Sequence, residues 1–127
     1  MTLRPTDQAA LDKLGLAYEE EADGAFTTVT ITGFPLPDGL QPAVSDLLIR
    51  LPPGFPDAAP DMFWLNPAVS TSGGAVPGTE SREVYLGRTW QRWSRHIGSQ
   101  WRPGIDDLAT YIAYIRRCFA DTTGRAA

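Results

Sequence analysis

A proline-rich stretch decides how this sequence folds: Leu51-Pro52-Pro53-Gly54-Phe55-Pro56-Asp57-Ala58-Ala59-Pro60. It lies between two segments with the composition of strands, residues 44–51 and residues 61–65. Proline has no backbone N–H to donate and is excluded from the interior of a sheet, so the stretch cannot continue either strand. The sequence therefore predicts an ordered, non-strand crossing between these two strands.

Two earlier strands complete a meander. Residues 25–33 alternate apolar side chains with threonines, which is typical of a half-buried strand. Residues 17–23 carry three consecutive glutamates and are interpreted as a solvated edge strand. The dipeptide Asp23-Gly24 between them is a strong signal for a tight hairpin turn. We therefore expect a four-stranded antiparallel meander over residues 17–65.

Helices are expected on both sides of the meander. Thr6 is the predicted N-cap of a leading helix over residues 8–16. Apolar residues recur at i, i+3 and i+7 over residues 90–97, which predicts a short helix, and helical spacing continues in a long helix over residues 104–119. The first turn of the long helix would hold two carboxylates that complement the helix dipole, Asp106 and Asp107. This order of elements predicts the α+β class.

The length of the chain suits a single domain over residues 1–127. Residues 70–80 have the composition of a linker and no periodicity, and they are predicted to form a mobile surface loop. The tail from about residue 122 is expected to fray.

Composition excludes several classes of function. The net charge of -4 disfavours sequence-independent nucleic-acid binding, which needs a basic face. No apolar run approaches the roughly 18 residues of a membrane span, and residues 1–13 have no apolar signal-peptide core. The single cysteine, Cys118, and the single histidine, His96, exclude an internal disulfide framework and a Cys/His zinc site of structural type. We expect a cytoplasmic protein without a cofactor or metal.

Two segments resemble motifs of the ubiquitin-conjugating enzyme superfamily. Residues Phe55-Pro56-Asp57-Ala58-Ala59-Pro60-Asp61-Met62-Phe63 resemble its Tyr-Pro-x-x-x-Pro-x-x-x-Phe crossing between the third and fourth strands. Residues Trp101-Arg102-Pro103-Gly104-Ile105 resemble its Trp-x-Pro before the helix that follows the active-site segment. The string Trp90-Gln91-Arg92-Trp93-Ser94-Arg95-His96 is similar to what the bacterial branch called prokaryotic family E carries. The resemblance implies a conjugating-enzyme fold in a bacterial ubiquitin-like pathway.

The chain departs from this family where the chemistry occurs. The usual enzymes place His-Pro-Asn several residues before a cysteine, and here Asn66-Pro67-Ala68 is the nearest trace. Counting back from Trp101 by the usual interval leads to Trp93 and Ser94, and a second register leads to Tyr85. None of these is a cysteine, so the resemblance implies the fold and the pathway but not thioester chemistry.

Ser94 and His96 are the candidate catalytic residues. A serine hydroxyl needs a base to become a useful nucleophile, and the pKa of histidine lies near working pH. Residues two apart share a face in an extended segment but not in a helix, so the pair would need an irregular backbone. The alternative is structural: Ser94 caps an element or faces solvent, and His96 bonds a carbonyl.

Three arginines are the candidate partner-binding residues, Arg88, Arg92 and Arg95. At helical spacing they would present one guanidinium face to a carboxylate-rich partner, or simply form a solvated helix face. Cys118 follows two arginines that could activate a thiol, but a lone helix cysteine is more often a packing residue. Because it lies far along the chain from Ser94, we expect that it could reach the site only if the helix unwound.

Two hypotheses on function remain open. In the first, the chain is an acyl transferase that receives a ubiquitin-like modifier from an activating enzyme and carries it on Ser94 or His96, as an oxyester or an acyl-imidazole. In the second, it is a binding module, similar to the inactive variants of the superfamily, that holds the modifier without carrying it. Expected partners are a ubiquitin-like protein, an activating enzyme and a deubiquitinase-type peptidase from the same operon.

Overall fold

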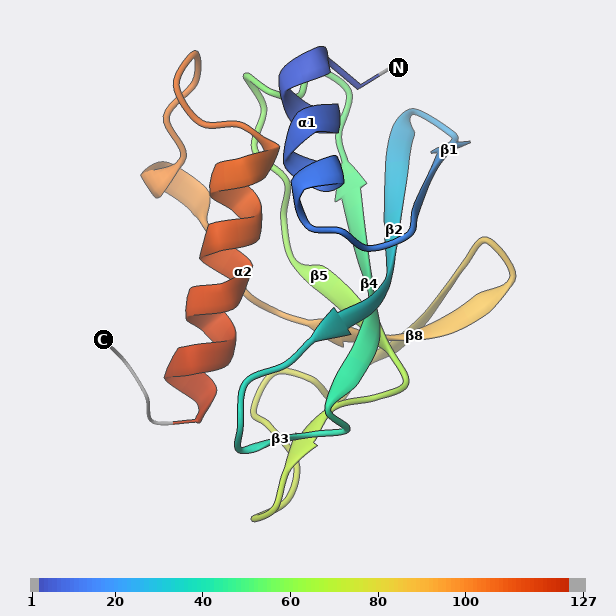
Figure 1. The fold of residues 1–127 in the computed structure, drawn as a ribbon, viewed down its shortest axis with the longest axis vertical. Coiled ribbons are helices and arrows are strands. Elements are labelled where there is room, and N and C mark those ends of the chain that lie inside the picture. The colour runs from blue at the N-terminus through green and yellow to red at the C-terminus, as the bar shows by residue number, and fades with distance from the viewer. Residues whose placement is uncertain (1–2, 124–127) are drawn as a thin grey trace.

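The computed structural model describes residues 3–123. Its elements follow in the order α1 (Pro5–Lys13), β1 (Tyr18–Asp23), β2 (Phe26–Pro35), β3 (Leu40–Gln41), β4 (Val44–Leu51), β5 (Phe63–Asn66), β6 (Ser70–Thr71), β7 (Arg82–Tyr85), β8 (Arg88–Trp93), the 3₁₀ turn η1 (Gly98–Gln100) and α2 (Leu108–Thr122). Six strands form one curled antiparallel sheet in the order β1-β2-β4-β5-β8-β7 (Figure 1). The short strands β3 and β6 pair separately. The fold is α+β, as the sequence predicted.

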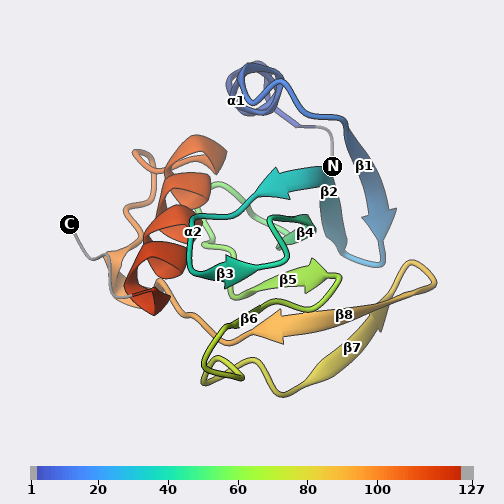
Figure 2. The ribbon, with the colours of Figure 1, turned by 60° about the horizontal axis from the view of Figure 1, so that its bottom comes forward.

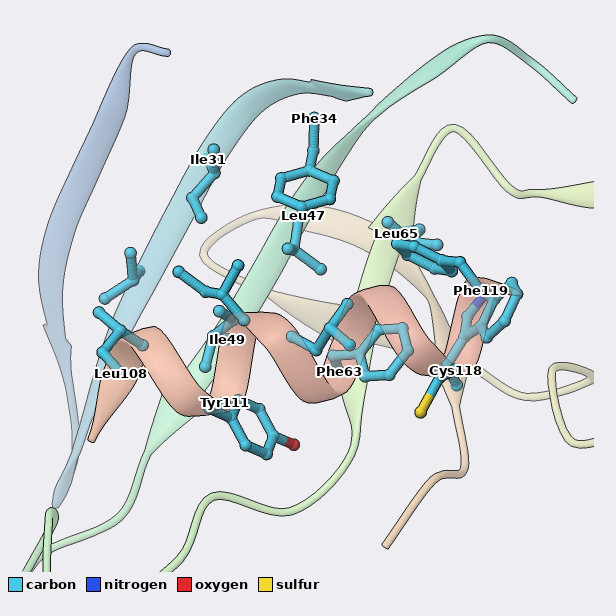
Figure 3. Packing of buried hydrophobic residues seen from close by; sticks show 14 of the residues in the cluster. Ile31, Phe34, Leu47, Ile49, Phe63, Leu65, Leu108, Tyr111, Cys118 and Phe119 are labelled. Carbon is cyan, nitrogen blue, oxygen red and sulfur yellow. The ribbon is translucent and has the colours of Figure 1, made fainter. Parts of the chain in front are cut away.

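Helix α2 lies across one face of the sheet, and α1 packs beside it (Figure 2). The core fills the space between α2 and the strands (Figure 3). Each large apolar side chain that is fully buried there contributes about 1.5–3 kcal/mol. The residues that α2 contributes are Leu108, Tyr111, Ile112, Ile115, Cys118 and Phe119.

Two carboxylates stabilise the N-terminus of α2. Asp107 is its N-cap and forms a capping box with Thr110. Asp7 of α1, which is only 1% exposed, accepts a hydrogen bond from the Leu108 N–H at 3.1 Å and pairs with Arg4. Negative charge at this end complements the helix dipole, so α1 is fixed to α2 by charge as well as by packing.

The four strands expected over residues 17–65 are confirmed as β1, β2, β4 and β5. Gly24 has φ 63°, as the hairpin turn between β1 and β2 requires. The leading helix begins earlier than predicted, because Pro5 occupies its first turn and Arg4, not Thr6, is the N-cap. The long helix begins later, at Leu108 rather than residue 104.

The prediction of a short helix over residues 90–97 is wrong. Residues 88–93 form strand β8, which pairs with β5 and, through a tight hairpin, with β7. Trp90 and Trp93 therefore do not share a helix face: Trp93 belongs to the core under α2, and Trp90 to a second cluster on the opposite face of the sheet. The sheet has six strands rather than four because this hairpin extends it.

The segment over residues 70–80 contains strand β6 and two buried side chains, Val76 and Thr79. Most of the tail predicted to fray, residues 124–127, lies outside the described residues. Within residues 3–123, no helix is long and apolar enough to cross a membrane.

Candidate active-site segment

The two family-like motifs meet in space. The indole N–H of Trp101 donates a hydrogen bond to the Pro56 carbonyl at 2.9 Å, and the rings of Phe55 and Trp101 lie 6.2 Å apart. Buried Asp106 accepts hydrogen bonds from the backbone and the guanidinium of Arg102. The proline crossing and the segment before α2 thus form one rigid support for residues 94–97, which leave the end of β8.

Residues 94–97 are held by backbone hydrogen bonds on both sides. The Ser94 N–H donates to the Gly78 carbonyl at 2.9 Å, and the Arg95 carbonyl accepts from the Met62 N–H at 3.1 Å. A Cβ on Gly78, which has φ +80°, would lie 2.8 Å from an arginine nitrogen of Arg95. The positive φ favours glycine at this position, and a larger residue would also displace the end of the Arg95 side chain.

Met62 has an unusual backbone conformation beside this segment. Its φ of 62° is left-handed, which is uncommon for a residue other than glycine. The conformation is held at both ends, because the Met62 N–H bonds Arg95 and its carbonyl accepts from the Tyr111 hydroxyl at 2.6 Å. Strained residues of this kind cluster at functional sites, where the surroundings over-determine them.

The structure places Ser94 and His96 on an irregular backbone, as the hypothesis required. The His96 ring does not bond Ser94: its Nδ1 lies 2.6 Å from Oδ1 of Asp61, and no hydrogen bond joins Ser94 to His96 within residues 3–123. Both members of the pair are exposed, at 60% for the His96 side chain and 59% for Asp61. A neutral imidazole whose Nδ1–H donates to a carboxylate has Nε2 free to act as a base or nucleophile.

A cleft of about 490 Å³ lies on the other side of the segment. Arg95 forms one wall and is held there by hydrogen bonds to the carbonyls of Ser94 and Pro77, each at 3.1 Å, and by its position 5.1 Å from the Trp93 ring. The other lining residues come from the 76–80 loop and from the C-terminal half of α2: Val76, Pro77, Tyr114, Cys118, Asp121 and Thr122.

Cys118 lines this cleft beside Arg95, but neither Ser94 nor His96 is among the lining residues, so the expectation that Cys118 reaches those two residues only if α2 unwinds stays a prediction. Its sulfur points away from the neighbouring core side chains (Figure 3). The helix brings Cys118 and Arg95 to the same cleft although they are far apart in sequence. Burial raises the pKa of the Cys118 thiol, against a hydrogen bond with Tyr114 and the charge of Arg95. The residue is a mostly protonated thiol rather than an activated nucleophile.

The three arginines do not form one face. Arg88 and Arg92 are two positions either side of Trp90 on β8 and lie on the outer face of the sheet, where they pair with Asp46 at 3.1 Å and Glu83 at 3.0 Å. Arg95, beyond the end of the strand, lies at the cleft instead. The predicted common face assumed a helix, and a strand arranges the same residues differently.

Sequence reasoning missed Asp61, Met62 and the α2 residues of the cleft. Asp61 stands in the proline motif, but nothing in its local pattern indicates a histidine partner distant in sequence. Asp121 lies near the end of a helix and carries no motif. Among residues 3–123 there is no group of three or more His, Cys, Asp or Glu side chains that could hold a metal.

Comparison with known families gives one result that covers nearly the whole chain. Residues 3–122 match the model of prokaryotic E2 family E. No curated protein and no solved structure gives a significant match. The family match supports a ubiquitin-conjugating-like protein, with a ubiquitin-like protein and an activating enzyme as the general classes of partner. The antiparallel sheet, the helix across it and the meeting of the two motifs agree with that result. The chain therefore belongs to prokaryotic E2 family E.

Proposed function

We propose that the chain accepts the activated C-terminal carboxyl of a ubiquitin-like protein on residues 94–96, and that His96 is the acceptor. The observation that carries this proposal is the Asp61–His96 pair, 2.6 Å apart, on the segment where the family interval leads one to seek the nucleophile. Ser94 is the less favoured acceptor, because no hydrogen bond within residues 3–123 joins its hydroxyl to the His96 ring that would have to take its proton.

The proposed step is an acyl transfer. Nε2 of neutral His96 attacks the modifier's activated carbonyl, the bond from that carbonyl to the activating enzyme breaks, and the leaving group takes up the released proton. The product is an acyl-imidazole, which the amine of a target then attacks to form an amide. Asp61 holds the ring in the required tautomer and stabilises its positive charge during the transfer.

Single-residue variants test the acceptor. Activating enzyme, modifier and ATP are mixed with the wild type and with His96→Gln, Ser94→Ala and Cys118→Ser, and the adduct is followed by rapid quenching and intact mass. We expect a short-lived adduct in the wild type, Ser94→Ala and Cys118→Ser, and none in His96→Gln. A stable, alkali-labile adduct lost in Ser94→Ala would identify an oxyester, and a thiol-labile adduct lost in Cys118→Ser would identify a thioester. Either result contradicts His96 as the acceptor.

Asp61→Asn separates positioning from folding. It retains the shape of the side chain but removes the charge that orients the imidazole, so we expect a slower adduct at an unchanged unfolding midpoint.

A second function, the non-catalytic binding module, is favoured by a different observation. No cysteine stands at Trp93, Ser94 or Tyr85, where the family registers lead. If no variant and no wild-type protein forms an adduct while the modifier still binds in titration calorimetry, the binding module is the correct function. A deubiquitinase-type peptidase encoded beside this protein would then act on products made elsewhere in the pathway.

A further inference from the structure

The sheet has two edges, and they differ in how they oppose pairing with another strand. The β1 edge carries three consecutive glutamates over residues 19–21. Charged residues on an edge strand oppose the addition of a further strand. The opposite edge, β7, instead exposes an apolar side chain, because Val84 is 67% exposed. The β7–β8 hairpin extends away from both helices, so neither helix covers this edge (Figures 1 and 2).

The register of the hairpin shows which backbone groups of β7 are open. Tyr85 pairs with Arg88 across a turn of Leu86 and Gly87, whose φ values are 52° and 77°. In a hairpin of this type the pair next to the turn is hydrogen-bonded, and hydrogen-bonded pairs alternate along the ladder. The bond from the Arg92 N–H to the Ser81 carbonyl follows the same alternation. The N–H and C=O groups of Arg82 and Val84 therefore point out of the sheet.

The side chains of β7 alternate in the same way. Glu83 and Tyr85 turn towards the cluster on the outer face, where Glu83 accepts from the Trp64 indole at 2.8 Å. Arg82 and Val84 turn to the other side and are exposed, and Leu86 at the turn is 40% exposed. Within residues 3–123, Arg82 forms no ion pair, and its guanidinium bonds the Thr79 carbonyl.

We infer that the β7 edge binds an extended, acidic segment of a partner protein by strand addition. The open groups of Arg82 and Val84 would supply the ladder, an apolar side chain would cover Val84, and a carboxylate would pair with Arg82. On β7, Glu83 is already paired with Arg92, which leaves the Arg82 guanidinium for a carboxylate of the partner. Strand β8 runs from this hairpin directly to Ser94, so the partner would dock one strand from the active-site segment.

A second copy of the chain fits this edge less well. If the open groups of Arg82 and Val84 of two copies paired with each other, the two Glu83 side chains would lie directly opposite one another, and like charges in that position are destabilising. Pairing of β7 with the glutamate-rich β1 of another copy would be head-to-tail and would not close, so it would build open chains. A segment of a different protein satisfies the same chemistry without that consequence.

Proline substitution tests the inference, because Val84→Pro removes an N–H that points away from β8. The ladder within the hairpin keeps its own bonds, and proline is tolerated on edge strands. The probe is an eight-residue peptide of alternating valine and aspartate, titrated into the ¹⁵N-labelled full chain. A matched peptide of alternating valine and lysine serves as the control. We expect changes in chemical shift and slower hydrogen exchange at the Arg82 and Val84 amides with the acidic peptide only.

Two variants test the backbone pairing and the charge preference separately. Val84→Pro should weaken binding of the acidic peptide at least about tenfold. Arg82→Glu should reverse the preference towards the lysine peptide. Binding that is equal in the wild type and Val84→Pro, or shifts that map elsewhere, would overturn the inference. Concentration-dependent sedimentation of the wild type that Glu19→Lys abolishes would overturn it in favour of a second copy. None of these outcomes depends on whether His96 carries an acyl group.

Discussion

The inner face of the sheet buries Trp93 beneath helix α2, whereas the outer face buries Trp64 and Trp90 beneath charged side chains. Trp93 stacks on Phe63 with ring centroids 5.6 Å apart and meets Phe119 edge-on at 5.3 Å. On the outer face the indole of Trp64 instead donates to a carboxylate, Glu83.

The outer cover is a connected polar network. Glu83 accepts hydrogen bonds from Trp64 and Tyr85 and pairs with Arg92, while Arg50 lies 4.2 Å from the ring centres of both Phe26 and Tyr85. One sheet thus buries aromatic residues on both faces without a second layer of helices. The two faces should therefore respond differently to mutation, pH and salt.

The largest expected effect is on the inner face. Phe119→Ala removes a fully buried ring that contacts Phe34, Phe63 and Trp93, and it should lower the free energy of unfolding by about 3–5 kcal/mol. Urea unfolding followed by fluorescence measures the loss. Ile105→Ala, at a side chain that is 64% exposed, is the control and should cost no more than about 0.5 kcal/mol. If both variants lost a similar free energy of unfolding, Phe119 would not be packed in a core between α2 and the sheet.

Glu83→Gln should have the next largest effect, about 1–3 kcal/mol at neutral pH, because it removes the charge to which three side chains donate. Burial raises the pKa of Glu83, but the hydrogen bonds from Trp64 and Tyr85 and the charge of Arg92 outweigh it, so the pKa lies below its ordinary value. Such a carboxylate contributes stability that is fully present above its unfolded pKa, about 4.3, and is lost as pH falls through the folded pKa.

The difference in unfolding free energy between the wild type and Glu83→Gln should therefore be constant from pH 7 to about pH 5 and narrow below about pH 4.3. Glu19→Gln, on the exposed edge strand, is the matched control and should change the free energy of unfolding little at neutral pH. If the difference in unfolding free energy between the wild type and Glu83→Gln stays the same in acid, the charge of Glu83 does not stabilise the outer face.

Sequence reasoning predicted the elements whose signals are local. The Asp23-Gly24 turn, the alternation over residues 25–33 and the prolines of the crossing each act within a few residues, and the corresponding strands were correct. The segment over residues 90–97 was wrong because Trp90, Trp93 and Ile97 also fit a strand with buried residues on both faces followed by an irregular turn. The spacing i, i+3 and i+7 alone favoured a helix, whereas in the structure Trp90 and Trp93 lie on opposite faces of one strand.

The candidate site was predictable only in part. The interval from Trp101 led to Trp93 and Ser94, and the irregular segment that follows β8 does hold Ser94 and the other candidate, His96. The partner of His96 could not be found in the same way, because Asp61 reaches it only through the folded crossing. The position of Cys118 beside Arg95 could not be predicted either, because α2 brings it there from a distant part of the chain.

A smaller effect is expected at the margin of the inner face, where the buried Cys118 lines the cleft. Because burial raises the pKa of this thiol, alkylation by iodoacetamide should be slow at neutral pH and should rise at a higher pH than for an unfolded cysteine. Arg95→Gln removes a charge that lowers the pKa, so it should slow the reaction further. Arg88→Gln, on the outer face, is the matched control. Labelling followed by intact mass measures the rates, and faster labelling of Arg95→Gln would show that access rather than charge controls this thiol.

The smallest expected effect separates the arginines of the outer face from one another. The Arg50 side chain is 16% exposed and lies between two rings, whereas Arg88 is 41% exposed and covers only Trp90, at 4.5 Å. Arg50→Met should lower the free energy of unfolding by about 1–2 kcal/mol, because the guanidinium loses its contact with two rings at a position that water hardly reaches. Arg88→Met should lower the free energy of unfolding by about 0–1 kcal/mol, because an exposed ion pair is screened by water.

Urea unfolding at low salt and at 1 M salt measures the loss of stability in both variants. High salt should remove what little Arg88 contributes and leave the Arg50 cost nearly unchanged, since a buried pair is screened much less. Equal costs that vanish together in salt would show that general charge attraction, and not the contact of individual guanidinium groups with rings, closes the outer face.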